Sequence, residues 1–178
     1  TAYTVNRGMD FITEQGDAPW CLHLSFIKPH WPYIASPPYH NMFGREDCLA
    51  PVRSEEERSD KANPIFRGFQ EHPESVSFSI DEVRLHMQPT YLGLVKQIDD
   101  HLGRLMVFLE KSGRLDDTLI VFTADHGDYQ GDHWQGEKEF MYEQGVCVPM
   151  IVVDPDETAQ RGVVSNALIE AVDMVPTF

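Results

Sequence analysis

An apolar run that ends abruptly in turn-forming and acidic residues constrains this chain more than any other feature. Residues 119–122 read Leu-Ile-Val-Phe and are soon followed by Asp125-His126-Gly127-Asp128. A β-branched and aromatic run stopped by turn residues indicates a buried β-strand. In α/β sheets, ligands and catalytic groups collect just beyond the carboxyl ends of such strands. We therefore expect the Asp-His loop to lie at a functional edge of a sheet.

Helices and strands alternate along the rest of the chain. Apolar spacing predicts helices over residues 2–14 and 79–112, with a kink or restart at Pro89, and the start of another helix at 168–178. Besides 119–122, strands are predicted at 19–26 and 148–153. Residues 35–79 are rich in proline and charge, which predicts a loosely structured excursion. This alternation is typical of an α/β domain with a mainly parallel sheet, and 178 residues make one domain or part of a larger one.

The net charge narrows the classes of partner. The chain carries 14 Lys and Arg against 29 Asp and Glu, a formal net charge of −15, which argues against binding DNA, RNA or anionic lipid. A small anionic substrate is not excluded, because a metal ion and a few local cations can reverse the field inside one pocket. No apolar stretch approaches the roughly 20 residues that a membrane span needs. We therefore expect neither a nucleic acid nor a membrane as partner.

Three cysteines bear on the cellular compartment. Cys21, Cys48 and Cys147 are odd in number and widely spaced, and they form neither a CxxC motif nor a zinc-finger pattern. Cys21 and Cys147 lie in apolar runs, so we expect them to be buried. A reducing compartment fits best, and we expect a cytoplasmic protein. The sequence begins at Thr1 without a Met and is expected to start within a domain, so a periplasmic location stays open.

Asp125 and His126 place a carboxylate oxygen beside an imidazole nitrogen. This pair suits Zn, Mn or Fe, and further carboxylates would shift the preference toward Ca or Mg. Two adjacent residues can face one metal ion where the backbone turns sharply, and we expect Gly127 to permit that turn. For a bare Asp-His-Gly the favoured alternative is a helix-capping Asp125 and a surface His126. The preceding strand and the Gly-Asp-His sequence at 131–133 favour the metal site.

The second Asp-His pair is interpreted differently. Asp132 and His133 follow Gly131 in what we predict to be a tight turn. There Asp132 would hydrogen-bond to the backbone, and His133 would orient a neighbour of the metal ligands. We therefore expect both to support the site rather than to bind the metal ion.

Two further residues carry anion chemistry. Lys138 comes 13 residues after Asp125, beyond a glycine-rich loop, and could hold a phosphate or sulfate oxygen as a point charge. The alternative for Lys138 is a solvated surface charge. His30 follows the predicted strand at 19–26 between two prolines, which restrain its backbone. Its imidazole could bind an anionic oxygen or protonate a leaving group, or it could simply pack between its aromatic neighbours. Lys28 is a less certain companion of His30 in this role.

These motifs together resemble the sulfatase and phosphonate monoester hydrolase family of the alkaline phosphatase superfamily. The most specific part is Thr-Ala-Asp-His-Gly-Asp, Gly-Asp-His and Gly-Glu-Lys within residues 123–138. The sequence Lys-Pro-His-Trp-Pro-Tyr at 28–33 resembles the family's Pro-His loop, and Asp-Met-Val-Pro-Thr at 173–177 resembles another segment of the family. Residues 91–123 resemble the helix and strand that lead into its metal loop. It covers most of the chain apart from 35–79. The Asp-His pair looks closer to phosphonate monoester hydrolases than to arylsulfatases, which have Asp-Asn. The resemblance implies an alkaline-phosphatase-like α/β fold, with a mainly parallel sheet and helices on both faces.

The resemblance also implies roles for four residues. Asp125 and His126 would bind one divalent metal ion, which could be Mn, Ca, Mg or Zn. Lys138 would contact the transferred anion or the bridging oxygen, and His30 would stabilise or protonate the leaving oxygen. The implied activity is metal-dependent hydrolysis of a small anionic ester, a phosphonate, phosphate or sulfate. A phosphomutase or phosphotransferase of the same superfamily, and a non-catalytic sulfatase-like module, stay open as alternatives.

The chain departs from the family pattern at the nucleophile. The family's nucleophile is a formylglycine made from a Cys or Ser in a Cys/Ser-X-Pro/Ala-X-Arg segment, and none of the three cysteines lies in such a segment. The family's first metal-binding Asp pair is also missing. We expect both upstream of Thr1, so that residues 1–178 form a partial sulfatase-like domain. Such a piece alone should be inactive, because the covalent step lacks its nucleophile. A homo-oligomer stays open.

Overall fold

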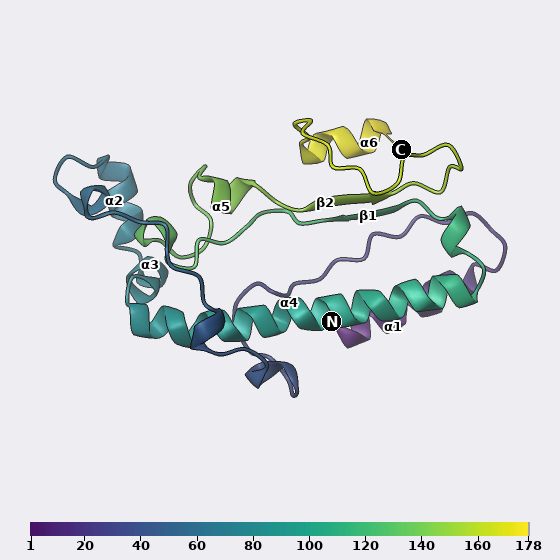
Figure 1. Ribbon diagram of the computed structural model, residues 1–178, viewed down its shortest axis with the longest axis horizontal. Coiled ribbons are helices and arrows are strands. Elements are labelled where there is room, and N and C mark those ends of the chain that lie inside the picture. The colour runs from purple at the N-terminus through teal and green to yellow at the C-terminus, as the bar shows by residue number, and fades with distance from the viewer. Residues whose placement is uncertain (178) are drawn as a thin grey trace.

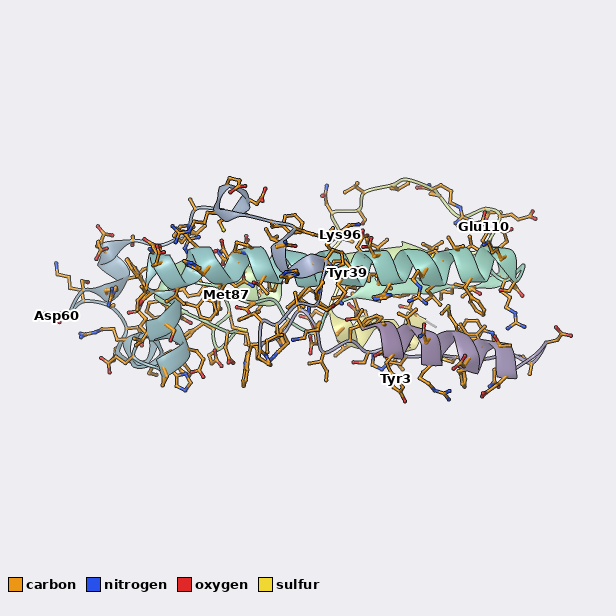
Figure 2. All side chains as sticks on the ribbon, turned by 90° about the horizontal axis from the view of Figure 1, so that it is seen from below. Tyr3, Tyr39, Asp60, Met87, Lys96 and Glu110 are labelled. Carbon is orange, nitrogen blue, oxygen red and sulfur yellow. The ribbon has the colours of Figure 1, made fainter. Side chains whose placement is uncertain are left out.

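The computed structural model describes residues 1–177 and places a long helix along an extended sheet ribbon (Figure 1). The long helix is α4 (Asp81–Lys111), and α1 (Ala2–Glu14) packs alongside it, as a second view confirms (Figure 2). Both helices were predicted from apolar spacing. Their buried apolar side chains are Val5 and Ile12 of α1, and Leu94, Ile98 and Leu109 of α4.

We predicted a kink or a restart at Pro89; helix α4 continues through this residue, so a restart is wrong. Proline lacks the N–H that would bond to the carbonyl one turn earlier, which here belongs to Leu85. That carbonyl accepts instead from the Cys48 thiol, with a sulfur–oxygen distance of 3.9 Å. A weak substitute partner for the freed carbonyl helps to explain why the helix tolerates the proline.

The sheet differs from the predicted one. Strands β1 (Ile120–Thr123) and β2 (Met150–Val153) confirm two predicted strands, but they pair antiparallel, with Ile120 opposite Val153. Within residues 1–177 no parallel pair forms, so the mainly parallel sheet is not what these residues build by themselves. The direction follows from the loop of residues 124–149, which returns the chain beside β1.

Residues 19–26, predicted as a strand, are extended but join no sheet in the described part of the chain. Their burial alternates from residue to residue, as in a strand. Leu22 and Leu24 point toward Gly8 of α1, while Cys21 lies on the open side and is exposed. The segment therefore has the side-chain pattern of a strand without a partner strand.

The excursion of residues 35–79 is more ordered than predicted. It contains the 3₁₀ turns η1 (Tyr39–Asn41), η2 (Arg45–Asp47) and η3 (Glu55–Arg58), followed by α2 (Pro64–Gln70) and α3 (Pro73–Phe78). Phe66 and Phe78 are only 5% and 8% exposed. Two of its prolines, Pro64 and Pro73, misled the prediction because each opens a helix at its first turn, where a missing N–H carries no penalty.

The remaining elements are short. They are η4 (Leu115–Asp117), η5 (Asp132–Trp134), α5 (Glu143–Val146), η6 (Ala171–Asp173) and α6 (Met174–Thr177). The helix predicted from residue 168 thus begins later, and Phe178 lies outside the described residues. Cys147 is exposed, so the predicted burial of Cys21 and Cys147 is wrong. Among the helices of residues 1–177, none is long and apolar enough to cross a membrane.

Candidate active site

Asp125 and His126 follow the carboxyl end of β1, as predicted, and their polar atoms converge. The Asp125 Oδ2 atom lies 3.7 Å from His126 Nε2, and the Asp125 side chain is 89% exposed. His126 Nδ1 lies 2.8 Å from the carbonyl oxygen of Gly127. Because a carbonyl only accepts, Nδ1 carries the proton and Nε2 keeps its lone pair. In the neutral ring, a carboxylate oxygen and a nitrogen lone pair therefore lie 3.7 Å apart, and both are donor types that a divalent metal ion accepts.

Gly127 is needed because another segment approaches it closely. Its φ is not in the left-handed region, but a Cβ at this position would lie 1.9 Å from the carbonyl oxygen of Gln144. Its N–H donates to the carbonyl oxygen of Gly145 over 2.8 Å. The glycine was expected to permit a sharp turn. Its structural reason is instead the backbone of residues 144–145, which lies directly against the metal-loop candidate.

His30 and Lys138 are brought together from opposite parts of the chain. Lys138 Nζ donates to His30 Nε2 over 3.0 Å, and His30 Nδ1 lies 3.0 Å from the carbonyl oxygen of Trp31. These partners assign the ring proton to Nδ1 and the lone pair to Nε2. The rings of His30 and His126 have centroids 6.1 Å apart. Lys28 instead donates to the Pro32 carbonyl within its own loop.

Tyr33 and Asp128 form a contact beside this group that the sequence analysis did not single out. The Tyr33 hydroxyl donates to Asp128 Oδ2 over 2.6 Å, and Asp128 Oδ1 accepts from the Gln130 N–H over 3.1 Å. Burial raises the pKa of Asp128, and the two hydrogen bonds oppose that rise. Burial and then the charge of Asp128 raise the pKa of Tyr33. The sequence signals that could have identified them are a tyrosine three positions after His30 and a second acid in the Asp-His-Gly-Asp motif.

A cavity of about 260 Å³ opens beside the His30–Lys138 pair. Its walls are aromatic rings, two carboxylates and residues of helix α3. The lining residues are Trp31, Tyr33, Pro73, Glu74, Ser77, Phe78 and Glu137. Glu137 Oε2 lies 3.9 Å from Lys138 Nζ. The helix α3 of the excursion therefore forms one wall of the space next to the candidate anion-binding residues.

Asp132 and His133 are engaged by the excursion. Asp132 Oδ1 accepts from the Val52 N–H over 2.8 Å, and the His133 N–H donates to the Val52 carbonyl over 2.8 Å. His133 Nδ1 lies 2.7 Å from Glu57 Oε1, and its ring stacks on Tyr142 with centroids 3.9 Å apart. The hydrogen bonds of both side chains therefore go to residues 52–57, which brace this turn.

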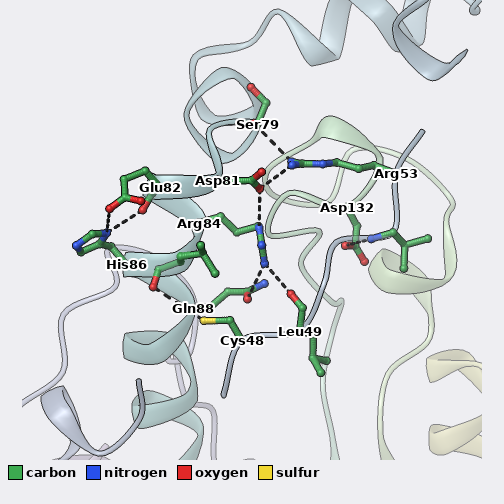
Figure 3. Close-up of polar contacts among 12 residues, drawn as sticks. Cys48, Leu49, Arg53, Ser79, Asp81, Glu82, Arg84, His86, Gln88 and Asp132 are labelled. Carbon is green, nitrogen blue, oxygen red and sulfur yellow. Dashed lines mark hydrogen bonds and ion pairs between the residues drawn. The ribbon is translucent and has the colours of Figure 1, made fainter. Parts of the chain in front are cut away.

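A buried arginine fixes the other side of this brace (Figure 3). Arg84 donates to the Leu49 carbonyl over 2.7 Å and to Asp81 Oδ1 over 3.3 Å, while Arg53 donates to the same carboxylate over 2.6 Å. Gly131 has φ +103, and a Cβ there would lie 2.8 Å from Arg84 Cδ. Helix α4, the excursion and the 131–134 turn are therefore packed as one unit.

The described residues offer candidates for only part of a metal-binding site. Within residues 1–177 no group of three or more His, Cys, Asp or Glu side chains is arranged to hold a metal ion. Zinc takes about four ligands and calcium about six to eight. Asp125 and His126 fit a divalent ion in donor type and tautomer, and they are candidates for two ligands of such a set.

Comparison with known proteins identifies the family of the chain. The sulfatase family model matches residues 1–178. The multifunctional alkaline phosphatase superfamily protein PehA of Trinickia caryophylli is 32% identical, with 100% of this chain and 37% of that protein covered. The arylsulfatase of Clostridium perfringens is 30% identical with the same coverage.

The structural comparison gives the same family. The phosphonate monoester hydrolase of Agrobacterium radiobacter superposes with a TM-score of 0.79 at 31% identity, covering 86% of this chain and 32% of that one. The chain thus spans about a third of the length of these relatives. The resemblance inferred from the motifs is confirmed, and the chain belongs to the sulfatase family of ester-hydrolysing enzymes in the alkaline phosphatase superfamily.

Proposed function

We propose that the intact protein hydrolyses phosphonate, phosphate or sulfate esters and uses one divalent metal ion bound by Asp125 and His126. The observation that carries this proposal is the convergence of His30, Asp125, His126 and Lys138 from three separate segments. Relatives named for sulfatase and phosphonate monoester hydrolase activities support hydrolysis. No observation favours a phosphomutase, a phosphotransferase or a non-catalytic module.

The metal ion would be held by an Asp125 oxygen and by His126 Nε2. When bound, it would supply Lewis acidity and neutralise negative charge on the ester. Mn, Ca, Mg and Zn all accept this oxygen and nitrogen pair. We propose that further ligands and the formylglycine nucleophile come from sequence beyond these 178 residues, since the chain spans only about a third of its relatives.

Lys138 would orient the anion. Its ammonium has three donors, and the structure uses one of them for His30 Nε2. The others can reach substrate oxygens as charge-assisted hydrogen bonds. When the ammonium turns to the substrate, His30 Nε2 is released. The freed Nε2 could take up a proton from water and pass it to the leaving oxygen, while the Trp31 carbonyl continues to accept from Nδ1.

Phosphonate esters are the first substrates to test. The superposition at 31% identity is with a phosphonate monoester hydrolase. The putative sulfatase yidJ of Bacteroides fragilis superposes with a TM-score of 0.61 at 22% identity, which shows the fold alone. The cavity lined by Trp31, Tyr33 and Phe78 supports an aryl or alkyl leaving group, since apolar and aromatic walls favour such groups. We propose a small anionic ester of this kind as the partner.

The sheet of the intact domain follows from the same proposal. Residues 19–26 keep the alternating burial of a strand, and Ile151 and Val152 of β2 are 57% and 55% exposed. Exposed apolar residues on a strand are normally covered in a complete domain. We propose that further strands complete a mainly parallel sheet with helices on both faces.

The test is an assay of the purified intact protein with a matched pair of esters. A 4-nitrophenyl phenylphosphonate and 4-nitrophenyl sulfate should be compared, with a chelator and then with added Mn, Ca, Mg or Zn. We expect hydrolysis that the chelator abolishes and one metal restores, with 4-nitrophenol released together with phenylphosphonate or sulfate. Failure to hydrolyse either ester would refute the proposal, and transfer to an added alcohol without hydrolysis would favour the transferase alternative.

A further inference from the structure

The loop that carries His30 is attached to the rest of the molecule at few points. Within the described structure, residues 27–34 make two hydrogen bonds to other segments: His30 with Lys138, and Tyr33 with Asp128. The other bonds of this stretch, such as that of Lys28 to the Pro32 carbonyl, are internal. The position of the His30 imidazole relative to His126 therefore depends on these two contacts.

The two contacts differ in what happens to them during a reaction. This step rests on the proposed function, in which Lys138 binds the anion. An ammonium that turns toward substrate oxygens weakens its bond to His30 Nε2 at the moment when His30 must be in place. The ring of Tyr33 lines the cavity proposed for the leaving group, but the proposed mechanism uses neither its hydroxyl nor the Asp128 carboxylate to bind the anion. The Tyr33–Asp128 bond can therefore persist throughout the cycle.

The Tyr33–Asp128 bond is also held at both of its ends. The Tyr33 ring is packed edge-on by Phe78 and Tyr91, with centroids 6.0 and 6.2 Å away. Asp128 stands two residues after His126, and its second oxygen accepts from the Gln130 N–H. A hydroxyl that donates to a carboxylate over 2.6 Å is a short, charge-assisted bond. It therefore joins a fixed aromatic ring to the metal-binding loop.

We propose that Tyr33 and Asp128 are positioning residues, which hold the His30 imidazole against the metal-binding loop so that it can serve the leaving oxygen. Neither residue is assigned to touch the reacting atoms. Tyr33 is three residues from His30, and Pro32 between them has a fixed φ, so displacement of the Tyr33 hydroxyl is transmitted to the imidazole with little slack.

The test uses the intact enzyme and two phosphonate esters that differ in leaving group. A 4-nitrophenyl ester leaves readily without a proton, whereas a phenyl or alkyl ester needs one, so loss of a positioned acid affects the second ester more. In Tyr33→Phe we expect kcat to fall about 10- to 100-fold on the poor leaving group and less than about threefold on 4-nitrophenol. The metal content should equal that of the wild type.

Three further variants make the result specific. Tyr91→Phe removes the hydroxyl of a second ring that packs on Tyr33, and it should leave both rates within about twofold, because that hydroxyl forms no hydrogen bond among residues 1–177. His30→Ala should show the same leaving-group dependence as Tyr33→Phe, with a larger loss. If Tyr33→Phe proves unstable, Asp128→Asn weakens the same Tyr33–Asp128 hydrogen bond from its other end. The activity of the double variant should be no lower than that of the less active single variant.

The outcomes separate the positioning role from the proposed function. Equal losses on both esters in Tyr33→Phe and Asp128→Asn, or no loss in either, would overturn the positioning role while leaving the hydrolase intact. A wild-type enzyme that hydrolyses neither ester would overturn the proposed function and the positioning role with it. A fall in kcat that is confined to the ester with the poor leaving group, in variants with full metal content, supports the positioning role of Tyr33 and Asp128.

Discussion

Replacing Gly127 with alanine would force the Asp125–His126 loop away from the segment that holds it. The new Cβ would lie 1.9 Å from the carbonyl oxygen of Gln144, where real contacts essentially never fall below 3.0 Å. The obstacle is backbone, so no side chain can rotate out of the way. The two segments must therefore separate by about 1.1 Å, and the hydrogen bond from the Gly127 N–H to Gly145 must lengthen or break.

A displacement of this size has consequences for both activity and stability. A misplacement of about 1 Å in a catalytic arrangement reduces the rate on the order of 100-fold. That corresponds to about 2.7 kcal/mol of lost transition-state stabilisation. Overpacking of this kind also destabilises by about 1–3 kcal/mol. At about 2–4 °C per kcal/mol for a domain of this size, Tm should fall by several degrees.

The assay compares Gly127→Ala with Gly103→Ala in the intact enzyme. Gly103 lies within α4, and a Cβ there meets no atom within 4 Å. That control should keep full activity and gain about 0.5–1 kcal/mol, because alanine favours the helix. In Gly127→Ala we expect kcat/KM and the metal content to fall. Wild-type activity together with wild-type metal content in Gly127→Ala would refute the reasoning that the 144–145 backbone holds the loop.

Three further substitutions test separate parts of the site. Lys138→Ala should lower kcat/KM about 100-fold or more with the metal retained, and loss of metal instead would refute its anion-binding role. Asp132→Ala removes the acceptor of the Val52 N–H and should lower the free energy of unfolding in urea by about 1 kcal/mol. The number of metal ions per protein should not change, and a lower number would show that Asp132 is a ligand. Phe66→Ala should destabilise by about 3–5 kcal/mol, and an unchanged unfolding midpoint would show that the excursion is as loose as its composition suggests.

The elements that follow from local sequence pattern were predictable. Apolar spacing located α1, α4, β1 and β2 to within a few residues, because each depends on short-range periodicity. Pairing direction depends on which remote segments lie together, so the antiparallel pair was missed. Prolines at the first turns of α2 and α3 were interpreted as signs of disorder, although at that position they favour helix.

The site was predictable where its residues formed motifs. Asp125, His126, Lys138 and His30 each follow a turn or strand end, and the structure brings all four together. Their chemical roles stay predictions until they are tested. Tyr33 and Asp128 are 95 residues apart and meet only through the fold, so no local pattern could pair them. The bracing of the 131–134 turn by residues 52–57 was hidden for the same reason.

The most direct test of the central claim is the metal content of His126→Ala in the intact enzyme. Metal per protein, measured by elemental mass spectrometry, should fall together with ester hydrolysis, because Nε2 is the nitrogen left free to bind. His86→Ala is the control, since that exposed histidine lies on α4 beside Glu82 and away from the site. It should keep both metal and activity. Full metal loading and full activity in His126→Ala would contradict the assignment of Asp125 and His126 as metal ligands.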